Sequence, residues 1–407
     1  MAFRAPLFLI TGFGWLLLSA LLGLALLLSM VTGSSLPPAL RTLHPHGALV
    51  GGAVQVVAAL ILRHQGRSRP LLYAALNGGT LALLAGLGAG QAWLAAGAGL
   101  AVLLALLALM GEAMKEGWYS GTAWLMLLLS LAMGGAMALH LLPQTWLGQG
   151  RLVHIHLGVL GFVTLTFVGA TYQMLPAALN AALHSPVLAR LTLALLPVLL
   201  LTLIAGFLTG HLLLDLAAGA GLLAAFALHA YNLVQTWRDA GRRRAAASDH
   251  FILAGVFLLL AGGTGMLVTV NALWHPQPMP FGKLHLIAYT HLALVGFVLL
   301  TVVGLLAHLL PLDLADELVK SNKKRGAYLA ELTAIAERWQ ALQLGALSLG
   351  TIGLALVASL VWQFSMGDWP VTIAAWAGTG LLTFGLVLAV LRVLTILTHH
   401  PDSQSNA

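Results

Sequence analysis

The stretch RLVHIHLGVLGFVTLTFVGATYQMLP, residues 151–176, decides the fold class, because it is a long apolar run with two histidines near its start. Its 26 residues are enough to cross a bilayer as a helix. An imidazole inside such a run costs free energy unless a partner satisfies its nitrogens. His154 and His156 therefore mark a place where this helix meets something polar or metallic.

Apolar runs of this kind fill the chain. Of its 407 residues, 60% are hydrophobic and 8% are charged, and the mean hydropathy of +0.95 excludes an ordinary soluble domain. There are twelve runs, at residues 7–32, 45–63, 71–90, 92–112, 119–142, 152–178, 187–209, 212–236, 250–274, 284–312, 340–365 and 370–397. The sequence predicts an all-α polytopic membrane protein with about 12 transmembrane helices, in one domain over residues 1–398. The first run is expected to be retained, since it is too long for a signal peptide.

Basic residues gather in the loops that follow even-numbered runs. Examples are Arg63, Arg67, Arg69, Arg242, Arg243, Arg244, Lys323, Lys324 and Arg325. The positive-inside rule then predicts cytoplasmic N- and C-termini in an inner (cytoplasmic) membrane. The net charge of +7 resides in these loops, so the lipid bilayer and not nucleic acid is the expected partner. Residues 313–338 are predicted to be a cytoplasmic connector helix, and residues 399–407 a disordered tail.

A histidine-marked repeat organises the runs. HLGVLGFVTLTFVGATYQMLP from His156 aligns without a gap on HLALVGFVLLTVVGLLAHLLP from His291, and 11 of 21 positions are identical. A shorter third copy, HGALVG, begins at His46. The copies open the second, sixth and tenth runs, which predicts a 4+4+4 pseudo-threefold arrangement with repeats at about 1–112, 119–236 and 250–397.

The predicted topology sorts the histidines between the two membrane surfaces. Nine are expected at or near the outer ends of helices: His44, His46, His140, His154, His156, His211, His275, His285 and His291. The other seven are expected at the inner surface as interfacial or loop residues: His64, His184, His229, His250, His308, His399 and His400.

Helical geometry separates the two histidines of the opening stretch. Residues two apart on an α-helix point about 200° apart, so His154 and His156 are expected to serve different sites. His156 has one face, and the opposite face carries His154, Gly161, Gly169 and Tyr172. The tenth run repeats this layout around His291, with its opposite face formed by Tyr289, His285, Gly296 and Gly304. Glycines on such a face admit either a neighbouring helix or a flat ring.

Clustered imidazoles in a membrane are most often ligands of haem iron, copper or zinc. The chain has no cysteine, which excludes thiolate metal sites and covalent c-type haem attachment. A haem also accounts for glycines, because a porphyrin needs a flat apolar slot.

At this point the chain resembles subunit I of the haem–copper oxidases, with twelve helices and histidines at the outer ends of helices two, six and ten. The string H-x4-G-x7-G-x2-Y-x3-P from His156 is similar to the low-spin-haem helix of the nitric oxide reductase and cbb-type branch. The opening FRAPLFLITGFGWLLLSALLGLALLL is distantly similar to NnrS-type membrane proteins, although Leu43 stands where their W-H-x-H motif has tryptophan.

This resemblance implies a b-type haem with His46 and His291 as axial ligands, and it places His156 at a copper ligand or facing a second haem. The further candidate metal ligands are His44, His154 and His285. Candidates that surround the cofactor are Tyr172, Tyr289, Gly161, Gly169, Gly296 and Gly304. The implied function is electron transfer, nitric oxide- or oxygen-related respiration or cofactor handling. If the chain is an enzyme, it is expected to be an oxidoreductase with a cytochrome or quinol donor, and copper is a further candidate metal.

The chain also departs from that family. The seventh run, 187–209, has no histidine, Tyr289 stands two residues before His291 where the family has histidine, and no carboxylate lies deep in the sixth run. A complete copper site and a proton-pumping path are therefore not expected.

Alternatives remain open at several levels. The whole chain could be a 12-helix secondary transporter of a small molecule or metal, although such carriers divide 6+6. Each histidine could be a hydrogen-bonded structural residue, and each tyrosine a packing residue. Asn271 and Gln173 could bond a haem propionate or bridge helices, and Gly262, Gly263 and Gly265 indicate close helix packing rather than nucleotide binding.

Overall fold

The computed structural model describes residues 4–65, 67–274, 276–279, 282 and 284–401. Over these ranges the regular secondary structure is helical throughout, and twelve helices are long and apolar enough to cross a membrane. The predicted fold class is confirmed. His275 lies outside the described residues, as do residues 402–407 of the predicted tail and the side chain of His64.

Each repeat has four membrane helices, and the second of them is built from several segments. The first repeat consists of α1 (Ala5–Thr32), α2 (Leu40–His46), η1 (Gly47–Ala53), α3 (Val54–Leu62), α4 (Pro70–Gly88) and α5 (Ala92–Ala113). The second consists of α6 (Trp118–Ala138), α7 (Leu147–His156), η5 (Leu157–Thr164), α8 (Leu165–Leu179), α9 (Pro186–Thr209) and α10 (Leu212–Asp239). The third consists of α11 (Ala246–Asn271), η6 (Leu284–Tyr289), η7 (Leu292–Leu299), α13 (Leu300–Leu318), α15 (Gln340–Leu360) and α16 (Trp369–Thr398).

The second, sixth and tenth spans form the centre of the bundle. In their most apolar windows 72%, 67% and 83% of residues are buried, against 28–50% in the other nine spans. Within each repeat this central helix packs on the first helix, and the third and fourth helices pair with one another. The three helices that carry the histidine repeat are therefore the ones best placed to bind a ligand inside the protein.

A π-helical segment interrupts each central helix, and the sequence analysis did not foresee it. The segments η1, η5 and η7 begin at Gly47, Leu157 and Leu292, one residue after His46, His156 and His291. A π-turn holds more residues than an α-turn, so it rotates everything after it relative to a uniform 100° wheel. Such segments are frequent at functional sites.

The predicted connector contains α14 (Asn322–Glu337), while α13 extends to Leu318. The α14 helix packs on α13 and α16 and buries Tyr328, Leu332 and Ala336. The start of the predicted tail is attached to it, because the Tyr328 hydroxyl donates to the His399 carbonyl oxygen at 2.6 Å. His399 is therefore part of the folded structure.

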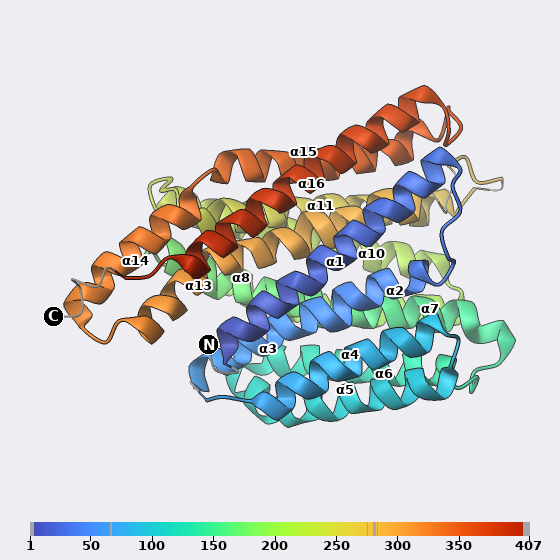
Figure 1. Cartoon of the computed structure of the whole chain (residues 1–407). Coiled ribbons are helices and arrows are strands. Elements are labelled where there is room, and N and C mark those ends of the chain that lie inside the picture. The colour runs from blue at the N-terminus through green and yellow to red at the C-terminus, as the bar shows by residue number, and fades with distance from the viewer. Residues whose placement is uncertain (1–3, 66, 275, 280–281, 283, 402–407) are drawn as a thin grey trace.

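The helices run side by side, so the bundle has two ends, and α1 begins at the same end as α16 finishes (Figure 1). We call this the basic end, since Arg63, Arg69 and Arg242 lie there. The opposite end carries His44, His46, His154, His156 and His285, and we call it the histidine end.

Candidate cofactor site at the histidine end

His46, His156 and His291 are equivalent residues, each immediately before a π-helical segment. In every case Nδ1 lies 2.8 Å from the carbonyl oxygen four residues earlier, on Thr42, Leu152 or Ile287. A carbonyl oxygen only accepts hydrogen bonds, so Nδ1 carries the proton and Nε2 keeps a lone pair. This is the tautomer, and the kind of backbone support, that metal-ligating histidines use.

A second pair of equivalent histidines, His44 and His154, ties each central helix to its neighbour. His44 Nδ1 lies 2.7 Å from the Ser19 carbonyl oxygen, and the Ser19 hydroxyl donates to the His44 carbonyl at 2.6 Å. His154 and Ser130 repeat this reciprocal arrangement at 2.8 and 2.9 Å. These two histidines are therefore hydrogen-bonded structural residues at Nδ1, whatever their Nε2 atoms bind.

The third repeat has Tyr289 in this position. A Cβ at Gly265 would lie 3.1 Å from the Tyr289 ring. In the other two repeats Gly23 and Gly134 leave the same room for the histidine rings, where a Cβ would come within 2.7 and 2.9 Å of a ring carbon. Tyr289 is thus a packing residue of α11 as well as a neighbour of His285, whose ring centroid is 5.5 Å away.

Between the first two repeats, His46 faces His154. Their ring centroids are 6.1 Å apart and the ring planes differ by 22°. Both Nδ1 atoms are already bonded to carbonyl oxygens, so the remaining Nε2 of each ring is an acceptor. Neither ring can donate to the other, and a cation or a hydrogen-bond donor between them would satisfy both.

The buried His156 ring packs on Phe207 of α9, in its own repeat, with centroids 4.8 Å apart. The two histidines of the opening stretch thus have different neighbours: His154 faces His46 of the first repeat, and His156 contacts α9.

Between the third and first repeats, His291 and His44 line one cavity. Its other walls come from α1, η7 and α16, through Ala20, Gly23, Leu24, Val295, Leu299, Leu382 and Leu386. Val295 and Leu299 follow His291 at intervals of four, so the cavity descends from the imidazoles along one apolar strip of the tenth span. Its volume is about 20 Å³, which is room for about one water molecule.

Two of the interfaces follow one rule. The histidine before the π-helical segment lies near the histidine that stands two residues before the equivalent position in the next repeat: His46 faces His154, and His291 lines a cavity with His44. The predicted haem ligand His46 therefore lies against His154, and His44 is the helix-two histidine that shares a cavity with His291.

The glycine face is filled by neighbouring helices. A Cβ at Gly161 would lie 2.6 Å from Met126 Cβ, and one at Gly296 2.6 Å from Phe257 Cγ. Gly169 packs against Tyr119, and Gly304 against Phe251. Of the two alternatives from the sequence, the structure shows helix packing and no slot for a ring at these four positions.

Three other predicted residues also have structural partners. Tyr172 packs edge-on against His229, with centroids 4.9 Å apart. Gln173 Nε2 donates to the Tyr119 hydroxyl at 2.7 Å. Asn271 bonds both the backbone N and the carbonyl oxygen of Met279, at 2.9 and 3.1 Å. Gln173 thus bridges two helices, and Asn271 holds the loop that follows α11.

Two histidines at the basic end contradict the expectation that they are interfacial. His229 and His250 are completely buried. Neither ring nitrogen of His229 has a hydrogen-bond partner among the described residues, and in His250 the same is true of Nε2. Their helices pack on the central spans, which encloses side chains that the topology alone places near the membrane surface.

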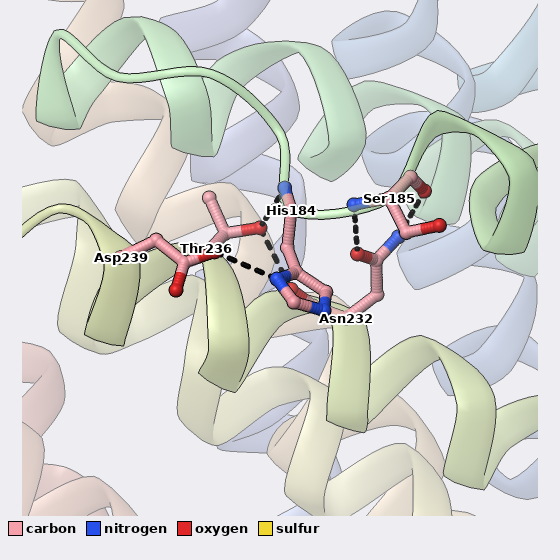
Figure 2. Close-up of polar contacts among 5 residues, drawn as sticks. All are labelled: His184, Ser185, Asn232, Thr236 and Asp239. Atoms are coloured by element: carbon pink, nitrogen blue, oxygen red, sulfur yellow. Dashed lines mark hydrogen bonds and ion pairs between the residues drawn. The ribbon is translucent and has the colours of Figure 1, made fainter.

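His184 fits its predicted place in a loop. Its Nδ1 lies 2.6 Å from Asp239 Oδ2, and its backbone N donates to Thr236 Oγ1 at 3.1 Å (Figure 2). The Asn232 amide bonds both backbone groups of Ser185 at 3.0 Å. Figure 2 shows the result: side chains of α10 hold the loop before α9, so these groups stabilise a turn.

No three His, Asp or Glu side chains of the described ranges are grouped so that they could hold one metal ion. Two imidazoles suffice for the axial positions of a haem, whereas a three-histidine copper site needs one more.

Some of this arrangement left a signal in the sequence. Ser19 and Gly23 recur as Ser130 and Gly134 with the same spacing, so the reciprocal pairs could have been found by aligning the first helices of the repeats. Arg392 was overlooked, although an arginine inside the last apolar run is itself a signal. A comparison with models of known protein families gave no match, and no curated protein matched the chain either.

Proposed function

We propose that this chain is a haem-binding integral membrane protein of the haem–copper oxidase subunit I type. The observation that carries the proposal is the apolar cavity between the first and third repeats, with His44 and His291 on its lining. Imidazole pairs and an apolar wall are the donor set and surroundings that a b-type haem requires.

The residue types that line the cavity are those that bind haem, but the cavity must widen before a haem can enter. The cavity volume is about 20 Å³, which is room for about one water molecule and far less than a ligand pocket. Haem binding would therefore require α16, with Leu382 and Leu386, to move away from α1 and η7 and open this interface. When bound, the haem supplies a one-electron iron couple. The protein's own residues would hold it: His291 and His44, or His46 in place of His44, would provide nitrogen ligands, and Val295 and Leu299 would exclude water.

A second imidazole pair supports additional ligation. His46 and His154 face one another with ring centroids 6.1 Å apart. We propose this pair, and His156 with His285, as secondary haem or copper positions. The proposed role is electron transfer or nitric oxide- and oxygen-related chemistry, with a cytochrome or quinol as donor. By the positive-inside rule, the histidine end faces away from the cytoplasm.

A transporter function has one observation in its favour. At the basic end, between the first two repeats, a second cavity is lined by polar as well as apolar side chains, among them Arg63, Tyr119, Ser120, Thr166 and Gln173. Carriers bind their substrates at such repeat interfaces.

The absorption spectrum of the purified protein separates these functions. Protein from haem-replete cells is expected to be coloured and, after reduction with dithionite, to show sharp α and β bands and a b-type pyridine haemochrome. A colourless preparation with no haemochrome would refute the haem proposal and favour the transporter.

Proton ejection coupled to oxygen reduction is expected to be absent from proteoliposomes that contain this protein alone. The α9 helix has no histidine and α8 has no carboxylate, so the residues for a three-ligand copper site and for proton uptake are not there. External pH is followed while reductant and oxygen are supplied, with an ionophore as control. Ejection that the ionophore abolishes would contradict this expectation.

A further inference from the structure

A small cavity at the basic end lies between the first two repeats, and its polar wall consists of hydrogen-bond donors. Its walls come from α3 and the residue that follows it, from the start of α6 and from α8. Its volume is about 40 Å³, which is room for about two or three water molecules. None of the described lining residues is acidic, and the polar ones are Arg63, Tyr119, Ser120, Thr166 and Gln173.

Arg63 brings a positive charge to this cavity. Its Nε donates to Asp313 Oδ1 of α13 at 2.9 Å, so the third repeat uses one edge of the guanidinium. A guanidinium has five N–H donors, and the hydrogen bonds among the described residues leave both Nη atoms of Arg63 unused. Asp313 itself is not part of the cavity lining. Arg63 therefore has donors left for a ligand in the cavity, at a point where all three repeats meet.

Two hydroxyl groups on the lining have no hydrogen-bond partner among the described residues. Ser120 is 5% exposed, and its backbone N donates to the Gly117 carbonyl oxygen at 3.1 Å, while its hydroxyl makes no bond. Thr301, the equivalent of Thr166 in the third repeat, donates to the Phe297 carbonyl oxygen at 2.8 Å, and Thr166 makes no such bond. Buried hydroxyls are rarely left unpaired, so both groups indicate an occupant of the cavity.

The α6 helix begins at the same cavity. Tyr119 and Ser120 are its second and third residues, and Gly117 before it has no side chain to cap the first N–H groups. Gln173 Nε2 donates to the Tyr119 hydroxyl at 2.7 Å, which holds α8 against this turn. The N-terminus of a helix carries partial positive charge. The start of α6 and Arg63 thus both place positive potential on one cavity.

We propose that this cavity binds one small monovalent anion of the size of chloride. Arg63, Ser120 and Thr166 supply the donors, and the start of α6 adds favourable potential. Water alone would leave this potential unbalanced, whereas an anion balances it. The cavity is too small for an organic ligand, and the exposed Gln173 marks its entry from the basic end. The anion would join the first repeat to the second, and Arg63 extends that contact to the third.

Chloride binding is measured on detergent-purified protein while sodium gluconate is replaced stepwise by sodium chloride at constant ionic strength. A ligand that binds only the folded state raises the melting temperature, so the wild type is expected to show a saturable rise. Crystals soaked in bromide then locate the ion, because bromide scatters X-rays anomalously. One anomalous peak is expected in the cavity between α3, α6 and α8.

Three variants remove the donors one at a time. Thr166→Val keeps the side-chain shape without the hydroxyl, and Ser120→Ala removes the second hydroxyl. Each is expected to raise the half-saturating chloride concentration about tenfold, the effect of losing one hydrogen bond to a charged group. Arg63→Gln is expected to abolish the saturable rise. If Arg63→Gln fails to fold, the two hydroxyl variants decide, because both keep the ion pair of Arg63 with Asp313.

Two matched controls keep the lining intact. Thr122→Val also removes a threonine hydroxyl from the first turns of α6, but that hydroxyl donates to the Trp118 carbonyl oxygen at 3.0 Å and lies outside the cavity lining. Arg67→Gln removes an exposed positive charge at the same end. Both are expected to leave the half-saturating chloride concentration unchanged.

Two results would overturn the proposal. One is a wild-type protein without a saturable rise, or bromide crystals without a peak in the cavity, which would mean that the cavity holds water only. The other is a saturable rise that Thr166→Val and Ser120→Ala leave unchanged, which would mean that chloride binds elsewhere. The candidate haem ligands lie at the opposite end of the bundle, and no haem signal is used in these experiments. This site therefore stands or fails independently of the proposed function.

Discussion

Replacing His291 with alanine is expected to remove the haem signal of the purified protein, and this is the largest single-residue effect we expect. His291 shares the apolar cavity with His44 and begins the most buried of the twelve spans. Its Nδ1 is held by the Ile287 carbonyl oxygen, which aims the other nitrogen away from its own helix. Changes to mere supports of metal ligands cost 10–100-fold in affinity, so loss of a ligand should lower haem per protein by more than about tenfold.

The control is His211→Ala. His211 belongs to the same end of the bundle but is exposed, at the start of α10. Pyridine haemochrome per mole of folded protein is the measurement, with size-exclusion profiles to show that each variant is folded. If His291→Ala and His211→Ala lost equal amounts of haem, the grouping of histidines at this end would have no role in haem binding. The haem proposal would then have to be abandoned.

Three further variants assign the partner of His291. If the haem binds in the cavity, His44→Ala should lose as much haem as His291→Ala. In that case His46→Ala and His154→Ala should each lose little haem. If the resemblance to the oxidase family holds residue by residue, His46→Ala should be the severe one. The pattern of losses therefore tests the pairing shown by the structure against the pairing implied by the family.

The sequence predicted the elements better than the interfaces between them. Twelve spans and three repeats follow from long apolar runs and from a repeated H-x4-G pattern, and both are properties of local sequence. The pairing of His46 with His154 depends on how repeats are placed around the bundle axis, and no local pattern contains that information. The histidines were thus identifiable, while their partners were not.

The π-helical segments are the second reason why the sequence predicted the helices better than the contacts between them. A helical wheel assumes 100° per residue, but the π-helical segments after His46, His156 and His291 break that assumption within one turn. The wheel placed Gly161, Gly169 and Tyr172 on one face with His154. The two glycines do share the contact of His154 with α6, but Tyr172 does not, because its ring packs on His229 of α10.

Replacing Gly161 or Gly296 with leucine is expected to unfold the bundle and remove every cofactor together. The nearest atoms to a Cβ at Gly161 are Met126 Cβ at 2.6 Å and Leu200 Cδ2 at 2.9 Å. At Gly296 they are Phe257 Cγ and Cβ, at 2.6 and 2.7 Å. A Cβ atom is fixed to its backbone, so the neighbouring helix itself would have to move. Overpacking of this kind typically costs about 1–3 kcal/mol, and more where the backbone must shift.

Gly263→Leu is the matched control. Gly263 is a helical glycine of α11 with no heavy atom within 4 Å of its Cβ position, so a leucine there should meet lipid and leave stability unchanged. Melting temperature, monodispersity and haem content of the detergent-purified variants are compared. We expect Gly161→Leu and Gly296→Leu to lose all three together, since these glycines hold α6 and α11 against the central helices. A folded Gly161→Leu protein that lost only the centre linked to His154 would contradict this expectation. It would mean that the glycine face borders a cofactor, and that the contact between α6 and the sixth span can open to admit it.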